Sequence, residues 1–142
     1  MKDKQNIRLK KYLSYLPGTL WALFILVLTG LPGDYFPEVT SFWEWLEPDK
    51  AAHLIMFGVF TFLIMWGHRV QYREKSKRTR FVLNTFILGV FYSALTEILQ
   101  DVFFAGRDGN IFDFMANCVG VLLGIGLFHL LFKNKITAAK SI

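Results

Sequence analysis

Residues 111–132 read IFDFMANCVGVLLGIGLFHLLF, a run in which Asp113 is the only Asp, Glu, Lys or Arg. A helix of this length rises about 33 Å, close to the ~30 Å thickness of a bilayer's hydrocarbon core. Small residues recur every four positions at Ala116, Gly120 and Gly124, which is typical of helices whose backbones pack closely in a membrane. The run therefore predicts a membrane-spanning helix with one close-packing face.

Three more apolar runs precede this one, at residues 12–31, 51–67 and 81–100. The first follows a basic start, but it is longer than the ~7–15 residues of the apolar part of a signal peptide. The whole chain is 54% hydrophobic, above the roughly 45–50% usual for soluble domains. The sequence predicts an all-α protein: a single domain over residues 1–142 that forms an integral membrane four-helix bundle.

Basic residues lie almost entirely on one side of the predicted membrane. Fourteen of the 16 Lys and Arg residues fall in the tail 1–11, in the tail 133–142, or between the second and third runs. Because such segments stay in the cytoplasm, both termini are predicted to be cytoplasmic. This spacing indicates membrane topology and lipid partners, and no nucleic acid.

The predicted outer connection between the first two runs is rich in aromatic residues. The segment Phe42–Glu47 predicts a short interfacial helix, since Trp43 and Trp45 suit the headgroup layer. An aromatic belt explains it most simply, and a docking surface for a lipid or protein is the alternative.

Polar residues from four segments fall in one layer near the predicted outer surface. They are Asp49, Lys50, His53, Glu97, Gln100, Asp101, Arg107, Asp108, Asp113 and Asn117. On the third run, Thr85, Gly89, Ser93, Glu97 and Gln100 recur at helical spacing, so they share one face. A carboxylate in a membrane is costly unless it is paired, so these faces should point toward neighbouring helices.

The charge of Glu97 needs a partner in this layer. We expect Arg107 first, because its planar guanidinium can grip a carboxylate with two hydrogen bonds, and His53 second. Asp113, His53 and Glu97 are the candidates for catalysis, and no standard catalytic motif is present. The His and carboxylate spacing is not diagnostic of a metal, so no metal or cofactor is assigned.

Two segments carry a resemblance to the VanZ-like membrane proteins. One is Asp49-Lys50-x-x-His53-x-x-x-Phe57; the other runs from Glu97-x-x-Gln100 through Arg107 to Asp113-x-x-x-Asn117-x-x-Gly120. The resemblance implies a ligand-binding set made of Asp49, Lys50, His53, Glu97, Gln100, Arg107, Asp113 and Asn117. The resemblance also implies a location in the plasma (inner) membrane of a bacterium. The family is named for an accessory protein of glycopeptide-resistance clusters, and nothing in this sequence indicates resistance.

Three functions remain open on the sequence. In the first, the polar layer binds or modifies a lipid-linked or peptidoglycan-related group at the outer leaflet. Lys50 and Arg107 would then hold an anion, with Gln100 and Asn117 orienting the other groups. The second is an intramembrane acid–base or metal-assisted enzyme that uses Glu97 and His53. The third is a structural or partner-binding bundle without chemistry.

Overall fold

The computed structural model describes residues 5–6, 9, 12–31, 48–103 and 110–138. Its helices are α2 (Leu16–Thr29), α3 (Pro48–Gly67), α4 (Arg69–Tyr72), α5 (Lys75–Phe103) and α6 (Ile111–Ala138). No strand occurs in these ranges, so the prediction of an all-α fold is confirmed.

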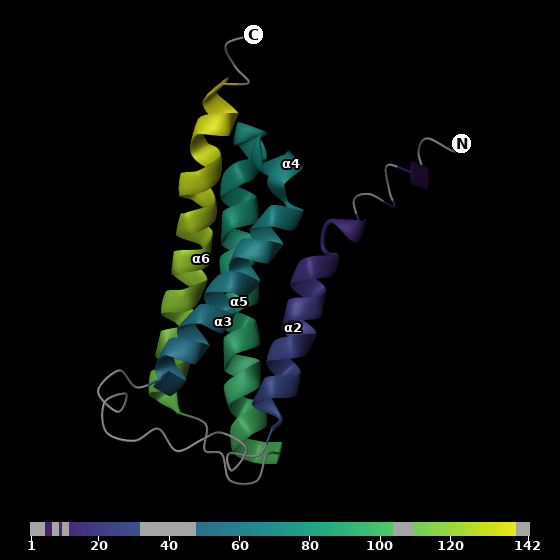
Figure 1. Ribbon diagram of the computed structural model, residues 1–142. Helices are drawn as coiled ribbons and strands as arrows, with labels where there is room; N and C mark the ends of the chain where they lie inside the picture. The colour runs from purple at the N-terminus through teal and green to yellow at the C-terminus, as the bar shows by residue number, and fades with distance from the viewer. Residues whose placement is uncertain (1–4, 7–8, 10–11, 32–47, 104–109, 139–142) are drawn as a thin grey trace.

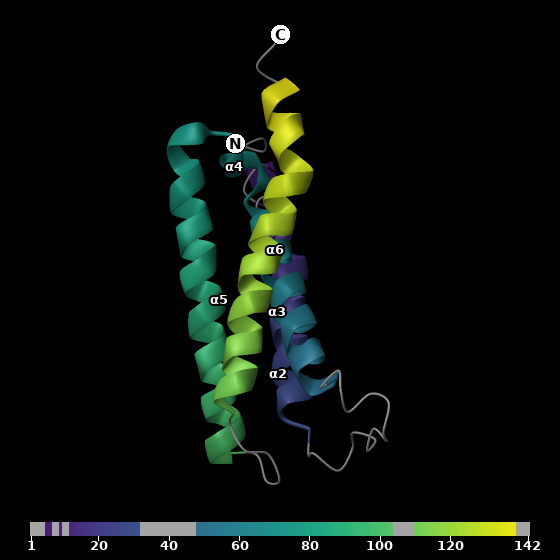
Figure 2. The same ribbon diagram turned by 90° about the vertical axis from the view of Figure 1, so that its left-hand side faces the viewer.

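Helices α2, α3, α5 and α6 alternate in direction along one bundle (Figure 1). The start of α2, the short helix α4 and the end of α6 lie at one end, which we call the α4 end. The starts of α3 and α6 lie at the other, which we call the site end. The most extensive helix contact is between α3 and α6. A view turned by 90° shows α5 along one side of α6, with α2 and α3 toward the other (Figure 2).

Three of the described helical segments are long and apolar enough to cross a membrane: Asp49–Gly67, Lys75–Val102 and Ile111–Phe132. Helix α2 is apolar but shorter, with 14 residues. Fourteen residues rise only about 21 Å. The predicted first span, 12–31, was therefore too long as a single helix.

The limits of α2 have local causes. Pro17 lies in the first turn of α2, where a proline ring is accommodated. If the helix began earlier and included residue 13, the proline ring would clash with the carbonyl of residue 13. Residues 12–15 instead form a separate turn, in which the Tyr15 N–H donates to the Tyr12 carbonyl. At the far end, the Gly30 N–H closes the last turn onto the Leu26 carbonyl.

The other helices also differ from the predicted runs at their ends. Helix α3 begins at Pro48 with Asp49 in its first turn, a favourable position for a carboxylate beside the positive end of the helix dipole. Helix α5 begins six residues before the apolar run, and α6 continues six residues into the predicted tail. The predicted interfacial helix Phe42–Glu47 lies outside the described residues.

Glycines bring the backbones of α3 and α6 into contact. A Cβ atom added to Gly120 would overlap the Leu54 carbonyl oxygen and lie 3.1 Å from the Gly58 nitrogen. One added to Gly124 would overlap the Gly58 carbonyl oxygen. The predicted close-packing face of residues 111–132 is therefore the face that α6 turns toward α3.

The bundle buries many polar side chains and exposes many large apolar ones, unlike a water-soluble bundle. Its buried polar side chains are Thr29, His53, Thr61, Thr85, Ser93, Thr96, Glu97, Gln100, Asp113 and Asn117. Large apolar side chains stand exposed on every long helix, among them Leu23, Ile55, Phe91, Ile98, Leu122 and Leu130. Such an exterior suits contact with lipid.

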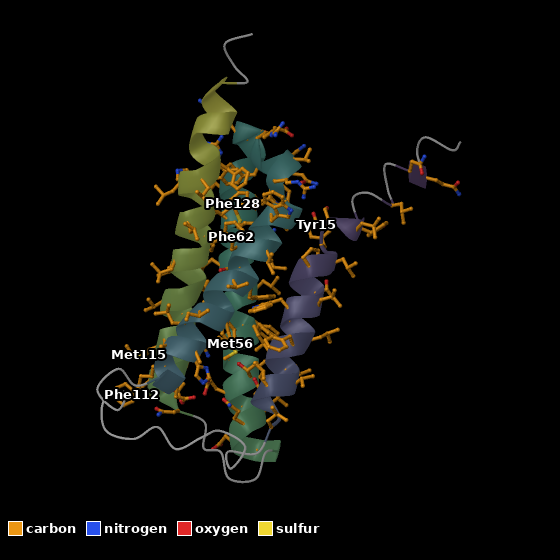
Figure 3. The ribbon with its side chains drawn as sticks, viewed as in Figure 1. Tyr15, Met56, Phe62, Phe112, Met115 and Phe128 are labelled. Atoms are coloured by element: carbon orange, nitrogen blue, oxygen red, sulfur yellow. The ribbon has the colours of Figure 1, made fainter. Side chains whose placement is uncertain are left out.

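Apolar side chains fill the space between the polar ones. Phe57 and Phe60 pack with Ile25 and Val121 in one buried cluster. Nearer the α4 end, Phe128 packs with Tyr72 and Met65, with Phe62 against them. In Figure 3 the labelled Phe62 and Phe128 lie side by side between α3 and α6, while Phe112 and Met115 point outward at the site end.

Helix α2 is held to the bundle by two hydrogen bonds between a side chain and a helix carbonyl. The Trp21 indole N–H donates to the Met56 carbonyl at 2.9 Å, and the Tyr92 hydroxyl donates to the Ala22 carbonyl. Each bond ties an aromatic side chain to a neighbouring helix, so together they fix α2 against α3 and α5.

Candidate functional site

A chain of hydrogen bonds joins three helices near the site end. The Asn117 Nδ2 of α6 donates to the Glu97 Oε1 of α5 at 2.9 Å. The Asn117 Oδ1 lies 3.1 Å from the Nδ1 of His53 on α3. All three side chains are buried, with Asn117 at 0% exposure. Asn117 is therefore the bridge between the carboxylate and the imidazole.

The direction of these bonds fixes the form of the imidazole. An amide oxygen can only accept, so the His53 Nδ1 must carry the proton that it shares with Asn117. In neutral His53 the lone pair is then on Nε2. A second contact supports this arrangement, since the Glu97 Oε1 lies 3.8 Å from the same Nδ1.

Two aspartates lie close to the same imidazole. The Oδ1 of Asp49, one turn before His53 on α3, lies 3.8 Å from Nε2. Asp113 of α6 is also close: one oxygen of each aspartate and one imidazole nitrogen lie within 4.8 Å of one another. Asp113 is buried, whereas the Asp49 side chain is 63% exposed. The group is thus open to the exterior through Asp49.

Glu97 has one more partner, which the sequence reasoning did not include. Its Oε2 accepts a hydrogen bond from the backbone N–H of Asn110 at 3.3 Å. The Asn110 Oδ1 in turn accepts from the N–H of Phe112 at 2.9 Å, which caps the start of α6. An asparagine directly before an apolar run is a helix-start signal, and it could have identified this residue.

The remaining predicted site residues fall into three groups. Gln100 is buried, and its amide makes no hydrogen bond to a described residue. Lys50 is half-buried, with its ammonium 5.9 Å from the centre of the Phe112 ring. Asp101 is exposed. Arg107 and Asp108 lie outside the described residues, and with them the predicted Glu97–Arg107 pair.

A pocket of about 370 Å³ opens between α5 and α6 beside this cluster. Glu97, Asp101 and Asn110 supply its polar lining, and Ile98, Phe114 and other apolar residues complete it. Glu97 therefore belongs both to the hydrogen-bonded chain and to the wall of an open pocket.

A second, partly buried polar group lies at the α4 end, where the sequence predicted no comparable layer. The Tyr72 hydroxyl and the His129 Nδ1 form a short hydrogen bond, and the Arg78 guanidinium lies 5.0 Å from the Tyr72 ring centre. Burial raises the pKa of the Tyr72 phenol, and the nearby charge of Arg78 opposes the rise. The phenol is therefore protonated, and the tautomer of His129 decides which of the two groups donates. Fifty-seven residues separate Tyr72 from His129, so no local pattern marks the pair.

The helices and the buried groups together define a class of protein. Carboxylate, imidazole and amide side chains are held between apolar helices of membrane-spanning length, as in helix-bundle membrane proteins. The family model of VanZ/LLP1 matches residues 15–132, which include every predicted ligand residue from Asp49 to Asn117. The chain belongs to the VanZ/LLP1 family. Neither the curated proteins nor the solved structures compared with the chain gave a match.

Proposed function

We propose that this protein is a four-span protein of a bacterial plasma membrane. In this proposal α2, α3, α5 and α6 cross the bilayer, both termini are cytoplasmic, and the site end lies at the outer leaflet. The cluster there binds or modifies a lipid-linked or other cell-envelope group. The observation that carries the proposal is the buried Glu97, held by Asn117 from another helix and lining an open pocket.

The helix dipoles and charges support this orientation. Helix α5 begins with the basic residues Lys75, Lys77, Arg78 and Arg80. Positive side chains at a helix start oppose the helix dipole, so helix stability does not account for them. Retention of basic segments in the cytoplasm does account for them. The site end is at the opposite end of α5, so the same argument supports an outer location for it.

The shape of the bundle supports an amphiphilic ligand. An apolar groove of about 610 Å³ runs between α3 and α6 on the exterior. Its lining runs from Leu54 and Ile55, next to His53, to Leu127 and Leu130 toward the α4 end. A lipid could place its acyl chain in this groove and its polar group near Asp49 and Lys50.

Lipid co-purification tests the function. Native mass spectrometry of the protein released gently from the membrane should show a bound lipid-linked species. Glu97→Gln should reduce its occupancy at least about tenfold if the carboxylate contributes a charged hydrogen bond. The matched control is Glu74→Gln, because Glu74 is an exposed glutamate near the start of α5. Equal occupancy in both variants would favour the structural or partner-binding bundle instead.

Cysteine labelling tests the topology. Single cysteines at Ser41 and Ser76, in a Cys118→Ala background, report on the two sides of the membrane. In intact cells an impermeant thiol reagent should modify the position-41 cysteine and leave the position-76 cysteine unmodified. The reverse pattern would put the site end in the cytoplasm and would rule out an outer-leaflet ligand.

A further inference from the structure

The apolar groove between α3 and α6 lies mainly in the half of the bundle nearer the α4 end. The middle of the apolar run 111–132 falls between Val121 and Leu122, and the α6 lining of the groove extends from Leu122 to Leu130. Between these two leucines the helix rises about 12 Å, close to the ~15 Å depth of hydrocarbon in one leaflet. The groove therefore matches the depth of one leaflet, measured from the middle of the bundle to the α4 end.

The open space of the groove has a local cause on α6. Gly124 brings α6 against α3, because a Cβ atom added to it would overlap the Gly58 carbonyl oxygen. Gly126 also lines the groove, but a Cβ atom added there would meet nothing within 4 Å. The neighbouring lining residues Leu123 and Leu127 carry full side chains, so the missing one at Gly126 leaves a hollow. Every lining residue is apolar or a glycine, so hydrocarbon is the chemistry that fits.

A cation is held in a fixed position beyond the α4 end of this groove. Trp66 lies one turn after the groove residue Phe62 on the same face of α3. Its ring packs against Phe132 of α6, with 5.4 Å between the ring centres. The Arg69 guanidinium lies 5.0 Å from the centre of the Trp66 ring, and its Nη1 donates to the Trp66 carbonyl at 2.9 Å. An arginine has five N–H donors and this bond to a described residue uses one, so donors remain for a ligand.

The charge around Arg69 favours an anionic ligand. Residues 69–80 contain six basic residues and one acidic residue, Glu74. Lys77 already offsets the charge of Glu74, with 2.7 Å between its Nζ and the Glu74 Oε2. Basic residues next to a membrane span attract the headgroups of anionic phospholipids. Membrane topology explains the number of positive charges, but it does not require a guanidinium held on an aromatic ring at the end of an apolar groove.

We propose that the α4 end of the groove binds an anionic phospholipid of the adjoining leaflet. One acyl chain lies in the hollow at Gly126, and the phosphate accepts hydrogen bonds from Arg69, beside Trp66 at the level of the headgroups. The inference rests on the proposed function only for the crossing of a bilayer by the helices. The envelope ligand of that function would enter at the site end and meet Leu54 and Ile55 first, so the two ligands use opposite ends of the groove.

Native mass spectrometry of the whole protein tests the proposal. The delipidated protein in detergent receives an equimolar mixture of phosphatidylglycerol and phosphatidylcholine with the same acyl chains. The parent should retain one phosphatidylglycerol per chain, and at least about fivefold more of it than of phosphatidylcholine. Arg69→Gln should remove most of this preference. Arg73→Gln is the matched control, because it removes the same charge from an exposed side chain four residues away, and it should keep most of the preference.

A second variant tests the groove itself. Gly126→Leu would fill the hollow, and its Cβ meets no other group, so the protein should keep the helical circular dichroism spectrum of the parent. The folded variant should lose the bound phosphatidylglycerol. Unchanged retention by a folded Gly126→Leu protein would mean that the acyl chain does not lie in the groove, and would overturn the proposal.

Three further results would also overturn it. The first is equal retention of the two lipids by the parent. The second is an equal loss of preference in Arg69→Gln and Arg73→Gln, which would mean diffuse attraction to the whole basic segment. The third is a dimer that Gly126→Leu dissociates, which would place a second copy of the chain in the groove. None of these results concerns the site end, so they would leave the proposed function standing. Absence of an envelope ligand with phosphatidylglycerol still held through Arg69 would count against the proposed function alone.

Discussion

Gly120→Ala should destabilise the bundle, because the added methyl group has no free space. Its Cβ would overlap the carbonyl oxygen of Leu54 and lie 3.1 Å from the nitrogen of Gly58. Both are backbone atoms of α3, so neither can rotate away. Helices α3 and α6 must then move apart by roughly 1 Å to restore ordinary contact distances.

The size of the effect has two parts. Overpacking of this kind typically costs about 1–3 kcal/mol. The separation also lengthens the bond between His53 and Asn117, now 3.1 Å, and loss of one such bond in a membrane costs about 0.6 kcal/mol. We therefore expect Gly120→Ala to lower the free energy of unfolding by about 2–4 kcal/mol. Gly126→Ala is the matched control, because a Cβ there meets nothing within 4 Å. It should change stability little, or raise it by up to about 1 kcal/mol through helix propensity.

The assay is reversible unfolding of the purified protein in mixed micelles, followed by circular dichroism, with parent, Gly120→Ala and Gly126→Ala measured together. The two alanine variants should differ by at least about 2 kcal/mol. Equal stabilities would refute the reasoning, since they would mean that α3 and α6 do not touch through backbone atoms at Gly120.

Three further changes test other contacts. Asn117→Ala should lower the free energy of unfolding by about 1–3 kcal/mol, because it removes both hydrogen bonds of the bridge. Adding Glu97→Gln should recover part of that loss. Strictly additive effects in the double variant would contradict the pairing of Asn117 with Glu97. Tyr72→Phe should remove the short bond to His129 and shift the imidazole resonances of His129 in NMR spectra. Unchanged resonances would mean that the two side chains do not interact. Trp21→Phe should lower the free energy of unfolding by about 0.6–1 kcal/mol in the same assay and should increase proteolysis of α2. Unchanged proteolysis of α2 would argue against the hydrogen bond of the Trp21 indole.

Helical spacing predicted which side of α5 faces inward. Thr85, Ser93, Glu97 and Gln100, taken from the sequence as one face of a single helix, are all buried in the bundle. The reason is that in a chain with apolar residues all round, a few polar positions at intervals of three and four can only avoid lipid by turning inward.

The hydrogen-bond partners of the polar side chains were harder to predict than the helix faces on which they lie. Asn117 was expected to orient its neighbours, but its place between Glu97 and His53 depends on the rotation of three helices relative to one another. The backbone N–H of Asn110 offers no side-chain signal for a contact with Glu97. The Tyr72–His129 pair depends on the turn at α4, which the basic composition of that segment did not predict. Apolar periodicity reports on burial and says little about which polar atoms meet.

The glycine contact between α3 and α6 is also a point about which the two helices can pivot. Gly58 is five residues from His53, or about 7.5 Å along α3, while the same helix continues past the contact toward the α4 end. A change of only ten degrees in the crossing angle would swing His53 by about 1.3 Å relative to Asn117, enough to break a 3.1 Å hydrogen bond. A change in the crossing angle that begins at the α4 end of the two helices would therefore displace His53 relative to Asn117 at the site end.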